Sequence, residues 1–367
     1  GIRDVERSRG LGDVYKRQAK PLTPLMFRTP HPFTFGGYAE SESWVPPQTL
    51  AGAIRSAIWE IQNRPPNIQE FLKEYRFTGV YKEKDNILST YSFEWRLIGP
   101  YYLRRNYVYY PAPIGLYYYR DDNQKTVFIP VENKITKEIK NIFDLPYGSF
   151  FVPAIEKGCE VSVEPLGGKL ICHACFNDLL EKKIEDGIIE VKVREDSIIS
   201  ITNIFSNITE THVKLDAKRK TIEIDSKGKG GFYVTKRLHF RDEWSIIFGI
   251  WIDENSNYLD WFETLDKKII RLGGEGGLVL IRRRNDLRLI EHKFLKLIDE
   301  KIKEKALMFI TTPSVFGDDN EDHFLPNNLR NGVVAYCATR IPVGGWSLVT
   351  PTGNGGWIKD MRWAVDR

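Results

Sequence analysis

The stretch Leu272-Gly273-Gly274-Glu275-Gly276-Gly277-Leu278 leads into Val279-Leu280-Ile281 and then into Arg282-Arg283-Arg284. Glycine has no Cβ and adopts positive φ readily, so this loop exposes its backbone N–H groups and can lie close to a phosphate chain. The three arginines, on the strand predicted to follow, add cationic side chains of the kind that contact phosphates. A glycine-rich hairpin turn without a ligand explains the loop equally well.

The loop carries neither of the common nucleotide-binding fingerprints. A P-loop would end in Gly-Lys-Ser or Gly-Lys-Thr, and a dinucleotide site spaces its glycines as G-x-G-x-x-G. Neither pattern occurs at residues 272–284. The loop is therefore interpreted as a candidate for contact with a phosphate backbone.

Outward from this loop, short segments of alternating polarity dominate the chain. They predict strands at residues 22–27, 221–225, 231–234, 244–252 and 306–310. Apolar residues at helical spacing predict helices at residues 48–59 and 294–302. Many strands and few helices favour an α+β fold of mainly antiparallel sheets over a doubly wound parallel sheet. The 367 residues exceed the size at which single cores stop growing, about 250–300 residues, so we expect two domains.

A second tract, residues 93–110, interleaves aromatic and basic residues. Single-stranded RNA is bound by such a mixture, because bases stack on aromatic rings while cations follow the phosphates. Strand-rich cores use the same aromatic residues for packing. The core interpretation is the favoured one for this tract.

Charge permits a polyanionic partner without requiring one. Lys and Arg number 53 against 49 Asp and Glu, which gives a formal net charge of +4. Between Lys214 and Arg241, nine basic residues face three acidic ones. This basic tract predicts a local phosphate-binding surface. The alternative is a solvated pair of strands with lysines on the open face.

Composition places the chain among ordinary globular proteins and excludes a membrane-spanning class. Hydrophobic residues make up 42% and charged residues 28%, and no run of about 18 apolar residues occurs. Four cysteines and no secretory signal favour a reducing cytoplasm. Residues 1–18 carry charge without hydrophobic periodicity and are interpreted as a non-native leader outside the fold.

Signals for catalysis or for a metal are weak. The six histidines are scattered, and neither G-x-S-x-G nor H-E-x-x-H occurs, so we expect no enzyme activity. Cys172 and Cys175 form one C-x-x-C pair, with Cys159 upstream. These are ligand types for zinc, but one pair without a second is a poor site. Buried or surface thiols are the favoured interpretation, and we expect no cofactor.

Several motifs, in their order along the chain, resemble one known family. They are Phe27-Arg28 with His31-Pro32-Phe33; residues 46–55; His212-Val213-Lys214-Leu215-Asp216 leading to Gly230-Gly231-Phe232-Tyr233; Leu272-Gly273-Gly274-Glu275; Thr312-Pro313-Ser314-Val315-Phe316; and Gly344-Gly345-Trp346-Ser347-Leu348 leading to Arg362-Trp363-Ala364-Val365. Together they resemble the third-subunit family of the Cmr complex, in the RAMP superfamily of CRISPR proteins. The resemblance spans nearly the whole chain after residue 20.

The resemblance implies two ferredoxin-like, RRM-related domains with insertions, at residues 19–210 and 211–367. The second would carry the glycine-rich loop, and its C-terminus would be truncated. It further implies a non-catalytic subunit of a type III-B effector in antiviral defence. Such a subunit holds the 5′ tag of the crRNA next to the large cyclase- and polymerase-like subunit, among other RAMP subunits.

The expected RNA-binding residues combine this resemblance with the loop. They are Arg28, His31, Gln48, Thr49, Arg55, Gly273, Gly274, Gly276, Gly277 and Arg282. In one alternative the same superfamily fold acts as a crRNA-processing endoribonuclease, with a histidine such as His31 as general base. In another the chain is a protein-interaction scaffold and its basic tracts serve only solubility.

Overall fold

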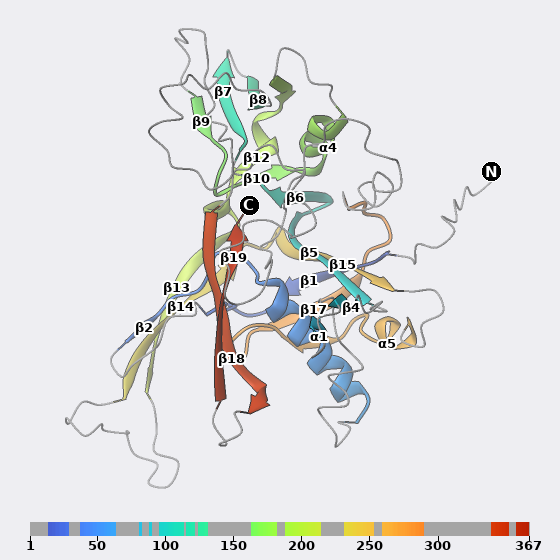
Figure 1. Cartoon of the computed structure of the whole chain (residues 1–367), viewed down its shortest axis with the longest axis vertical. Coiled ribbons are helices and arrows are strands. Elements are labelled where there is room, and N and C mark those ends of the chain that lie inside the picture. The colour runs from blue at the N-terminus through green and yellow to red at the C-terminus, as the bar shows by residue number, and fades with distance from the viewer. Residues whose placement is uncertain are drawn as a thin grey trace.

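Eight strands from both halves of the chain form the largest sheet of the computed structural model (Figure 1). The structure describes residues 14–28, 37–63, 81–82, 88–89, 95–113, 115–121, 124–130, 163–181, 188–213, 231–252, 259–289, 339–351 and 357–366. In spatial order the strands are β12 (Ile198–Ser200), β10 (Lys169–Cys172), β6 (Tyr107–Pro111), β5 (Trp95–Arg104), β15 (Trp244–Ile252), β1 (Val14–Pro21), β17 (Leu278–Arg283) and β16 (Ile269–Arg271). Every neighbouring pair in this sheet is antiparallel.

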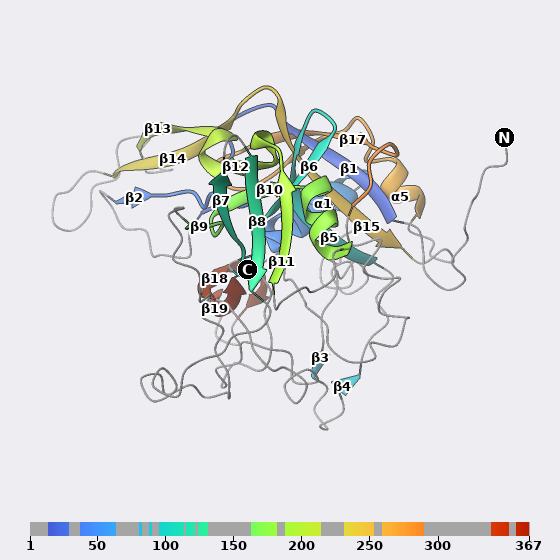
Figure 2. The same cartoon turned by 90° about the horizontal axis from the view of Figure 1, so that it is seen from above.

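Smaller elements surround this sheet. The remaining strands are β2 (Tyr38–Ala39), β3 (Tyr81–Lys82), β4 (Leu88–Ser89), β7 (Tyr117–Asp121), β8 (Gln124–Pro130), β9 (Val163–Pro165), β11 (Ile188–Val193), β13 (Phe205–Val213), β14 (Phe232–Phe240), β18 (Thr339–Pro351) and β19 (Trp357–Asp366). Within the described residues, the α-helices are α1 (Pro47–Ile61), α4 (His173–Glu181) and α5 (Leu259–Glu263), and two short 3-10 turns cover Glu195–Ser197 and Ile201–Asn203. Strands β11, β8, β7 and β9 form a separate sheet of four, whose strands are labelled in Figure 2. The prediction of an α+β fold with mainly antiparallel sheets is confirmed.

Strand β15 lies in the middle of the large sheet because its sequence is apolar on both faces. Ile246, Ile247, Phe248 and Ile250 are all fully buried. A strand with both faces covered reads as a continuous apolar run rather than an alternating one. Each such side chain contributes roughly 1.5–3 kcal/mol on burial. The strand predicted at residues 244–252 is confirmed in its position and length.

Helix α1 forms where the sequence predicts it and packs through one stripe. Its buried residues are Leu50, Ala51, Ala53, Ile54, Ala57 and Ile58. This spacing matches the repeat of an α-helix. Pro47 occupies the first turn, where the missing N–H costs nothing. The stripe lies against β16 and β5, so the helix covers the sheet near the start of the glycine-rich loop.

The aromatic tract at residues 93–110 forms the hairpin of β5 and β6. Tyr101, Tyr102, Tyr109 and Tyr110 are almost completely buried. The rings of Tyr101 and Tyr110 pack with centroids 4.6 Å apart. The core interpretation of this tract is therefore confirmed, and these rings cannot stack on bases.

The treatment of residues 14–18 as lying outside the fold is wrong. They form the first part of β1, which pairs with β15 on one side and with β17 on the other. Backbone hydrogen bonds make this pairing, so a charged segment without an apolar pattern can still occupy the middle of a sheet. Residues 1–13 lie outside the described residues, and the non-native origin of the leader stays a prediction.

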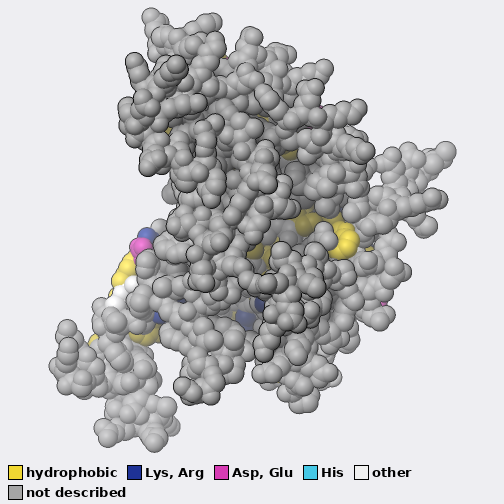
Figure 3. Space-filling view, viewed as in Figure 1, with side chains coloured by type: hydrophobic (Ala, Val, Ile, Leu, Met, Phe, Trp, Pro, Cys, Tyr) yellow, Lys and Arg dark blue, Asp and Glu magenta, His cyan; other side chains and the backbone are white. Residues whose placement is uncertain are grey.

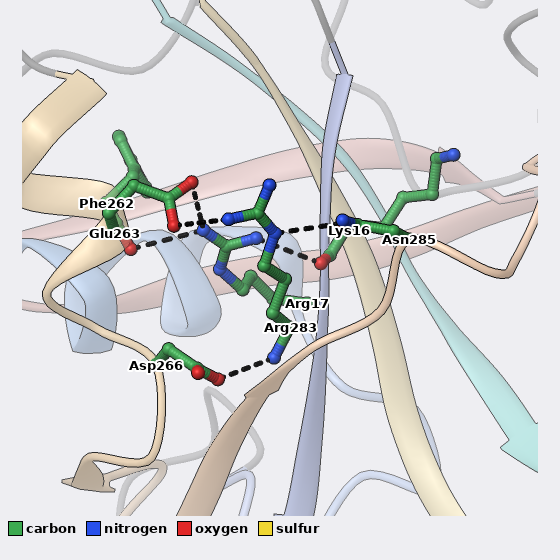
Figure 4. A network of polar contacts seen from close by, with 7 residues as sticks. All are labelled: Lys16, Arg17, Phe262, Glu263, Asp266, Arg283 and Asn285. Atoms are coloured by element: carbon green, nitrogen blue, oxygen red, sulfur yellow. Dashed lines mark hydrogen bonds and ion pairs between the residues drawn. The ribbon is translucent and has the colours of Figure 1, made fainter. Parts of the chain in front are cut away.

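Arg17 lies on β1 in the middle of the large sheet, and its charged side chain is surrounded by polar partners (Figure 4). Its side chain is fully buried and pairs with Glu263 at 3.4 Å. Its guanidinium also donates to the backbone oxygens of Lys16 and Phe262. Burial lowers the pKa of Arg17, and the nearby Glu263 partly offsets that effect. Arg283, directly opposite Arg17 on β17, binds the other oxygen of Glu263 at 2.7 Å.

The strand predicted at residues 22–27 is replaced by a less regular segment. Strand β1 ends at Pro21, and the chain then makes only isolated bridges, Leu25 to Leu238 and Arg28 to Ser41. Pro21 and Pro24 lack the N–H group that a continuous ladder needs, which explains the interruption. The predicted elements at residues 221–225, 294–302 and 306–310 lie outside the described residues.

The large sheet takes strands from both predicted domains. The predicted boundary between residues 210 and 211 falls inside β13, which pairs along its whole length with β14. The described strands give no sign of a division at this point. The division into two domains at residues 19–210 and 211–367 stays a prediction.

Candidate functional site

The glycine-rich loop joins β16 to β17 as a tight hairpin. Leu272 N–H donates to the carbonyl of Gly277 at 2.8 Å, which closes the base of the loop. Three residues at its tip have positive φ, namely Gly273 at 80°, Glu275 at 55° and Gly276 at 73°. This backbone path therefore depends on glycine at two of the three positions.

The four glycines of the loop have two different surroundings. A Cβ on Gly273 would stand 2.3 Å from the carbonyl oxygen of Met26, and one on Gly277 would stand 2.6 Å from that of Leu272. These two glycines allow close packing inside the protein. A Cβ on Gly274 would have only the Met26 oxygen near it, at 3.8 Å, and one on Gly276 would meet nothing within 4 Å. Gly274 and Gly276 are exposed and form the part of the loop that a ligand can approach.

The segment of residues 22–28 ties this loop to the hairpin of β13 and β14. On one side, Gly274 N–H donates to the Met26 carbonyl at 2.8 Å. On the other side, Leu25 exchanges two backbone hydrogen bonds with Leu238 of β14. Arg237 of β14 also donates to the carbonyl of Pro24 and pairs with Glu210 of β13 at 3.0 Å. Three segments far apart in sequence therefore lie side by side.

Tyr233 on β14 lies near both the loop tip and Arg28. Burial raises the pKa of Tyr233, the negative charge of Glu275 raises it further, and the positive charge of Arg28 lowers it. The ring of Tyr233 stacks on His212 of β13, with centroids 4.9 Å apart and an interplanar angle of 15°. His212 Nε2 lies 2.8 Å from the hydroxyl of Thr235, which fixes the imidazole in place. The result is a rigid aromatic pair beside an exposed backbone loop. We call Gly274, Glu275, Gly276, Arg28, Tyr233 and His212 the loop-tip surface.

The structure places Arg28 near the loop tip, and it places three other predicted residues, Gln48, Thr49 and Arg55, on helix α1. Gln48 is exposed and Thr49 half-buried in the first turn of α1. Arg55 lies about 10 Å further along the helix axis, at a rise of about 1.5 Å per residue. It is half-buried, and burial lowers its pKa. His31 lies outside the described residues.

The three arginines after the loop also differ from one another. Arg283 pairs with Glu263, and Arg284 pairs with Asp286 at 2.8 Å. Arg282 is exposed and makes no ion pair within the described part of the chain. It lies about 13 Å along β17 from Leu278, at a rise of about 3.3 Å per residue. Arg282 can therefore contact only a ligand that extends beyond the loop.

The two described cysteines of the C-x-x-C pair are buried at the junction of β10 and α4. Cys172 and Cys175 are both free thiols. Burial raises the pKa of Cys175, and a protonated thiol is a poor metal ligand. Within the described ranges no three His, Cys, Asp or Glu side chains gather as a metal site. Cys159 lies outside those ranges.

A polar cleft of about 660 Å³ is lined by residues of the large sheet and of the sheet of four. Most of its cations are already matched by acids. Lys125 pairs with Glu195 at 2.9 Å, and Arg104 pairs with Glu243 at 3.0 Å. The cleft is therefore mixed in charge and is a weaker candidate for a polyanion than the loop-tip surface.

Comparison with known proteins identifies the family. A family of CRISPR-associated proteins, Cas_Cmr3, matches residues 17–353. The chain belongs to the Cas_Cmr3 family. No curated protein matches it.

Solved structures of CRISPR effector subunits are similar to this Cas_Cmr3 chain at low identity. A chain of the type III-B Cmr-β complex bound to cognate target RNA and AMPPnP is 16% identical, with a TM-score of 0.46 over 96% of this chain and 84% of that one. A chain of the Csm3–Csm4 subcomplex from a type III-A complex is 13% identical, with a TM-score of 0.41 over 96% and 90%. Cmr4 from Pyrococcus furiosus is 9% identical, with a TM-score of 0.24 over 74% and 98%.

Three residues of the loop-tip surface were absent from the predicted site of this Cas_Cmr3 chain. Glu275 belongs to the glycine-rich loop, and His212 and Tyr233 belong to the motif of residues 212–216 and 230–233, so the sequence patterns include all three residues without assigning them to the site. His212 and Tyr233 lie opposite each other on neighbouring strands, and this follows only from the register of β13 with β14, which the sequence does not give.

Within the described residues, no helix has the length and apolar character needed to cross a membrane.

Proposed function

We propose that this Cas_Cmr3 chain is a non-catalytic crRNA-binding subunit of a type III-B CRISPR effector complex. It holds the repeat-derived 5′ tag of the crRNA next to the large cyclase- and polymerase-like subunit, in the cytoplasm, as part of antiviral defence. Other RAMP subunits complete the complex. The proposed domains are ferredoxin-like and RRM-related. The observation that carries the proposal is the open space around Gly274 and Gly276 beside Arg28 and the aromatic pair.

This arrangement suits single-stranded RNA. Exposed backbone without side chains lets a phosphate come close, and a guanidinium supplies the countercharge. Aromatic rings offer stacking partners to unpaired bases. The surface of the hairpin is mixed in character, with hydrophobic, basic and acidic side chains at the edge over β2 and β14 (Figure 3). Tyr38 and Phe232, both about half exposed, contribute to that edge.

The non-catalytic role rests on how the described histidines are held. An RNA cleavage reaction without metal needs a general base and a general acid close to one phosphate. His212 is stacked on Tyr233 and bonded to Thr235, and His173 is 3.1 Å from the hydroxyl of Tyr110 at the far side of the sheet. These two imidazoles belong to separate sites. His239, a third described histidine, is exposed on β14 six residues from Tyr233, about 20 Å along the strand. The endoribonuclease alternative assigns the general base to a histidine such as His31.

Purification of the full chain from its native host, with sequencing of the co-purified RNA, tests the proposal. We expect RNAs that begin with the repeat-derived tag, together with the large subunit and other RAMP proteins. Recovery of the chain without RNA, or with RNAs that lack the tag, would contradict it.

Incubation of the purified chain with labelled repeat RNA, with and without divalent metal, tests the absence of catalysis. We expect the RNA to stay intact. Specific cleavage that is lost in His31→Ala would instead support the endoribonuclease alternative.

A further inference from the structure

Glu275 is an acidic residue at the one place on the loop where a phosphate would be expected. It lies between Gly274 and Gly276 at the exposed tip, and its own φ is 55°. A non-glycine residue in this conformation costs conformational free energy that glycine would not. The loop therefore keeps a strained carboxylate where a glycine would be easier to accommodate and would not repel phosphate.

No contact within the described part of the protein explains why a carboxylate stands at this position. Within the described residues, the Glu275 side chain makes no hydrogen bond and no ion pair. By contrast, Glu40 pairs with Lys236, and Glu210 pairs with Arg237. Strain retained at an exposed residue without a structural partner points to a function in binding.

We propose that Glu275 reads the Watson–Crick edge of one RNA base by accepting a hydrogen bond from its amino group. The inference rests on the proposed RNA-binding function of the loop-tip surface. An ionised carboxylate only accepts hydrogen bonds, so it requires a donor on the ligand. Adenine, guanine and cytosine carry an exocyclic amino group, whereas uracil has carbonyl oxygens at the corresponding positions and its single donor, N3–H, lies between them.

The neighbours of Glu275 fit this role. Arg28 and Glu275 both lie within electrostatic range of Tyr233, so Arg28 adds a positive charge to this surface, which offsets the repulsion between the carboxylate and the RNA phosphates. Tyr233, stacked on His212, offers a ring against which the base can stack. The Gly274 N–H is held by the Met26 carbonyl, so the loop tip is fixed before the RNA arrives. A fixed acceptor discriminates between bases more strongly than a mobile one.

Binding of labelled tag RNAs to the full chain tests the inference, with each nucleotide of the tag changed in turn to uridine or, where it is uridine, to cytidine. We expect one position at which uridine weakens binding by at least about fivefold. The variant Glu275→Gln should lose that discrimination, because an amide both donates and accepts. Glu40→Gln, which removes the same formal charge at a carboxylate that pairs with Lys236, should keep it.

A second variant distinguishes base recognition by the Glu275 carboxylate from the conformational strain of its positive φ. Glu275→Gly should also lose the discrimination, while its melting temperature stays the same or rises because the positive φ is no longer strained. The inference is overturned if Glu275→Gln strengthens binding of all the RNAs equally, since the carboxylate would then act only by repulsion. It is also overturned if Glu275→Gly lowers the melting temperature by several degrees with the discrimination kept. If the wild-type chain binds no tag RNA, the proposed function itself fails.

Discussion

At the scale of single residues, the glycine-rich loop combines two kinds of glycine that the sequence alone cannot tell apart. Gly273 and Gly277 face backbone carbonyls at distances that no Cβ can tolerate. Gly274 and Gly276 face open space, but Gly276 also has a φ of 73°. Gly274 is therefore the position at which a larger side chain tests ligand approach with the least disturbance of the protein.

We predict that Gly274→Val weakens binding of tag RNA by at least about tenfold, equivalent to roughly 1.4 kcal/mol. The added side chain would stand between the loop backbone and the phosphate, whereas the folded protein offers it room. Adding Gly276→Val should deepen the loss, with a strain of about 1 kcal/mol from its positive φ. Fluorescence anisotropy with labelled RNA measures the affinity, and thermal denaturation measures the stability.

Two other glycines serve as controls for this experiment. Gly167, which also faces open space but lies in the turn between β9 and β10, should accept valine without any change in RNA binding. Gly277→Val should instead unfold or strongly destabilise the protein, because its Cβ would meet Leu272 and Leu25. Unchanged affinity in Gly274→Val would show that the loop is only a turn.

At the scale of elements, the sequence predicts helices and strands with a long apolar pattern well, and it predicts the charged strand β1 poorly. The sequence predicts α1 and β15 correctly because each has a long apolar pattern with its own period. It misses the first half of β1 because Lys16, Arg17 and Gln18 show no such pattern. Strand pairing is made by the backbone, and the neighbours β15 and β17 lie more than 200 residues away in the chain.

The same limit applies to the candidate site. The sequence predicts the loop because glycine has distinctive chemistry, and it predicts Arg28 through the resemblance to a known family. The contribution of Tyr233 and His212 depends on the register of β13 with β14, and on the segment of residues 22–28 that joins this hairpin to the loop. Long-range pairings of this kind leave no local signal in a single sequence.

Arg17 provides a test of how β1 is stabilised. We predict that Arg17→Met leaves the free energy of unfolding within about 1 kcal/mol of the wild type or raises it, because a well-packed apolar side chain often replaces a buried ion pair without loss. Glu263 would keep Arg283 as a partner at 2.7 Å. Arg17→Ala should lower the free energy of unfolding by roughly 2–4 kcal/mol, since it leaves a cavity.

Urea denaturation of the two variants measures both effects. A loss of more than about 3 kcal/mol in Arg17→Met would show that the charge of Arg17, rather than its volume, stabilises the sheet. Arg120→Met, at an exposed arginine that pairs with Glu195, is the control and should change the free energy of unfolding by less than about 1 kcal/mol.

At the scale of the whole molecule, a net charge of +4 says little about RNA binding, because the cations of the strands beside the loop differ in whether they have acidic partners. Arg283 and Arg284 pair with Glu263 and Asp286. Arg282 and Lys20 are exposed and carry no ion pair among the described residues. They lie on the same face of the sheet, because Lys20 is opposite Leu280, two residues before Arg282 on β17. Under the proposed function, Arg282 and Lys20 offer unneutralised charge to the RNA along β1 and β17.

We therefore predict that RNA affinity falls with salt, and that individual arginines contribute to this fall according to their pairing rather than their number. Each phosphate contact adds about 0.7 to the slope of log affinity against log salt for a single strand. Arg282→Ala should reduce the slope by about that amount. Arg283→Ala removes the same formal charge, but its guanidinium is bound to Glu263, so the slope should stay as in the wild type. Affinities measured across a salt series for the wild type and both variants show whether the slope depends on the ion pairing of each arginine or only on the net charge. Equal reductions in the two variants would show that the slope follows net charge, and a flat affinity in the wild type would exclude phosphate contacts as the basis of binding.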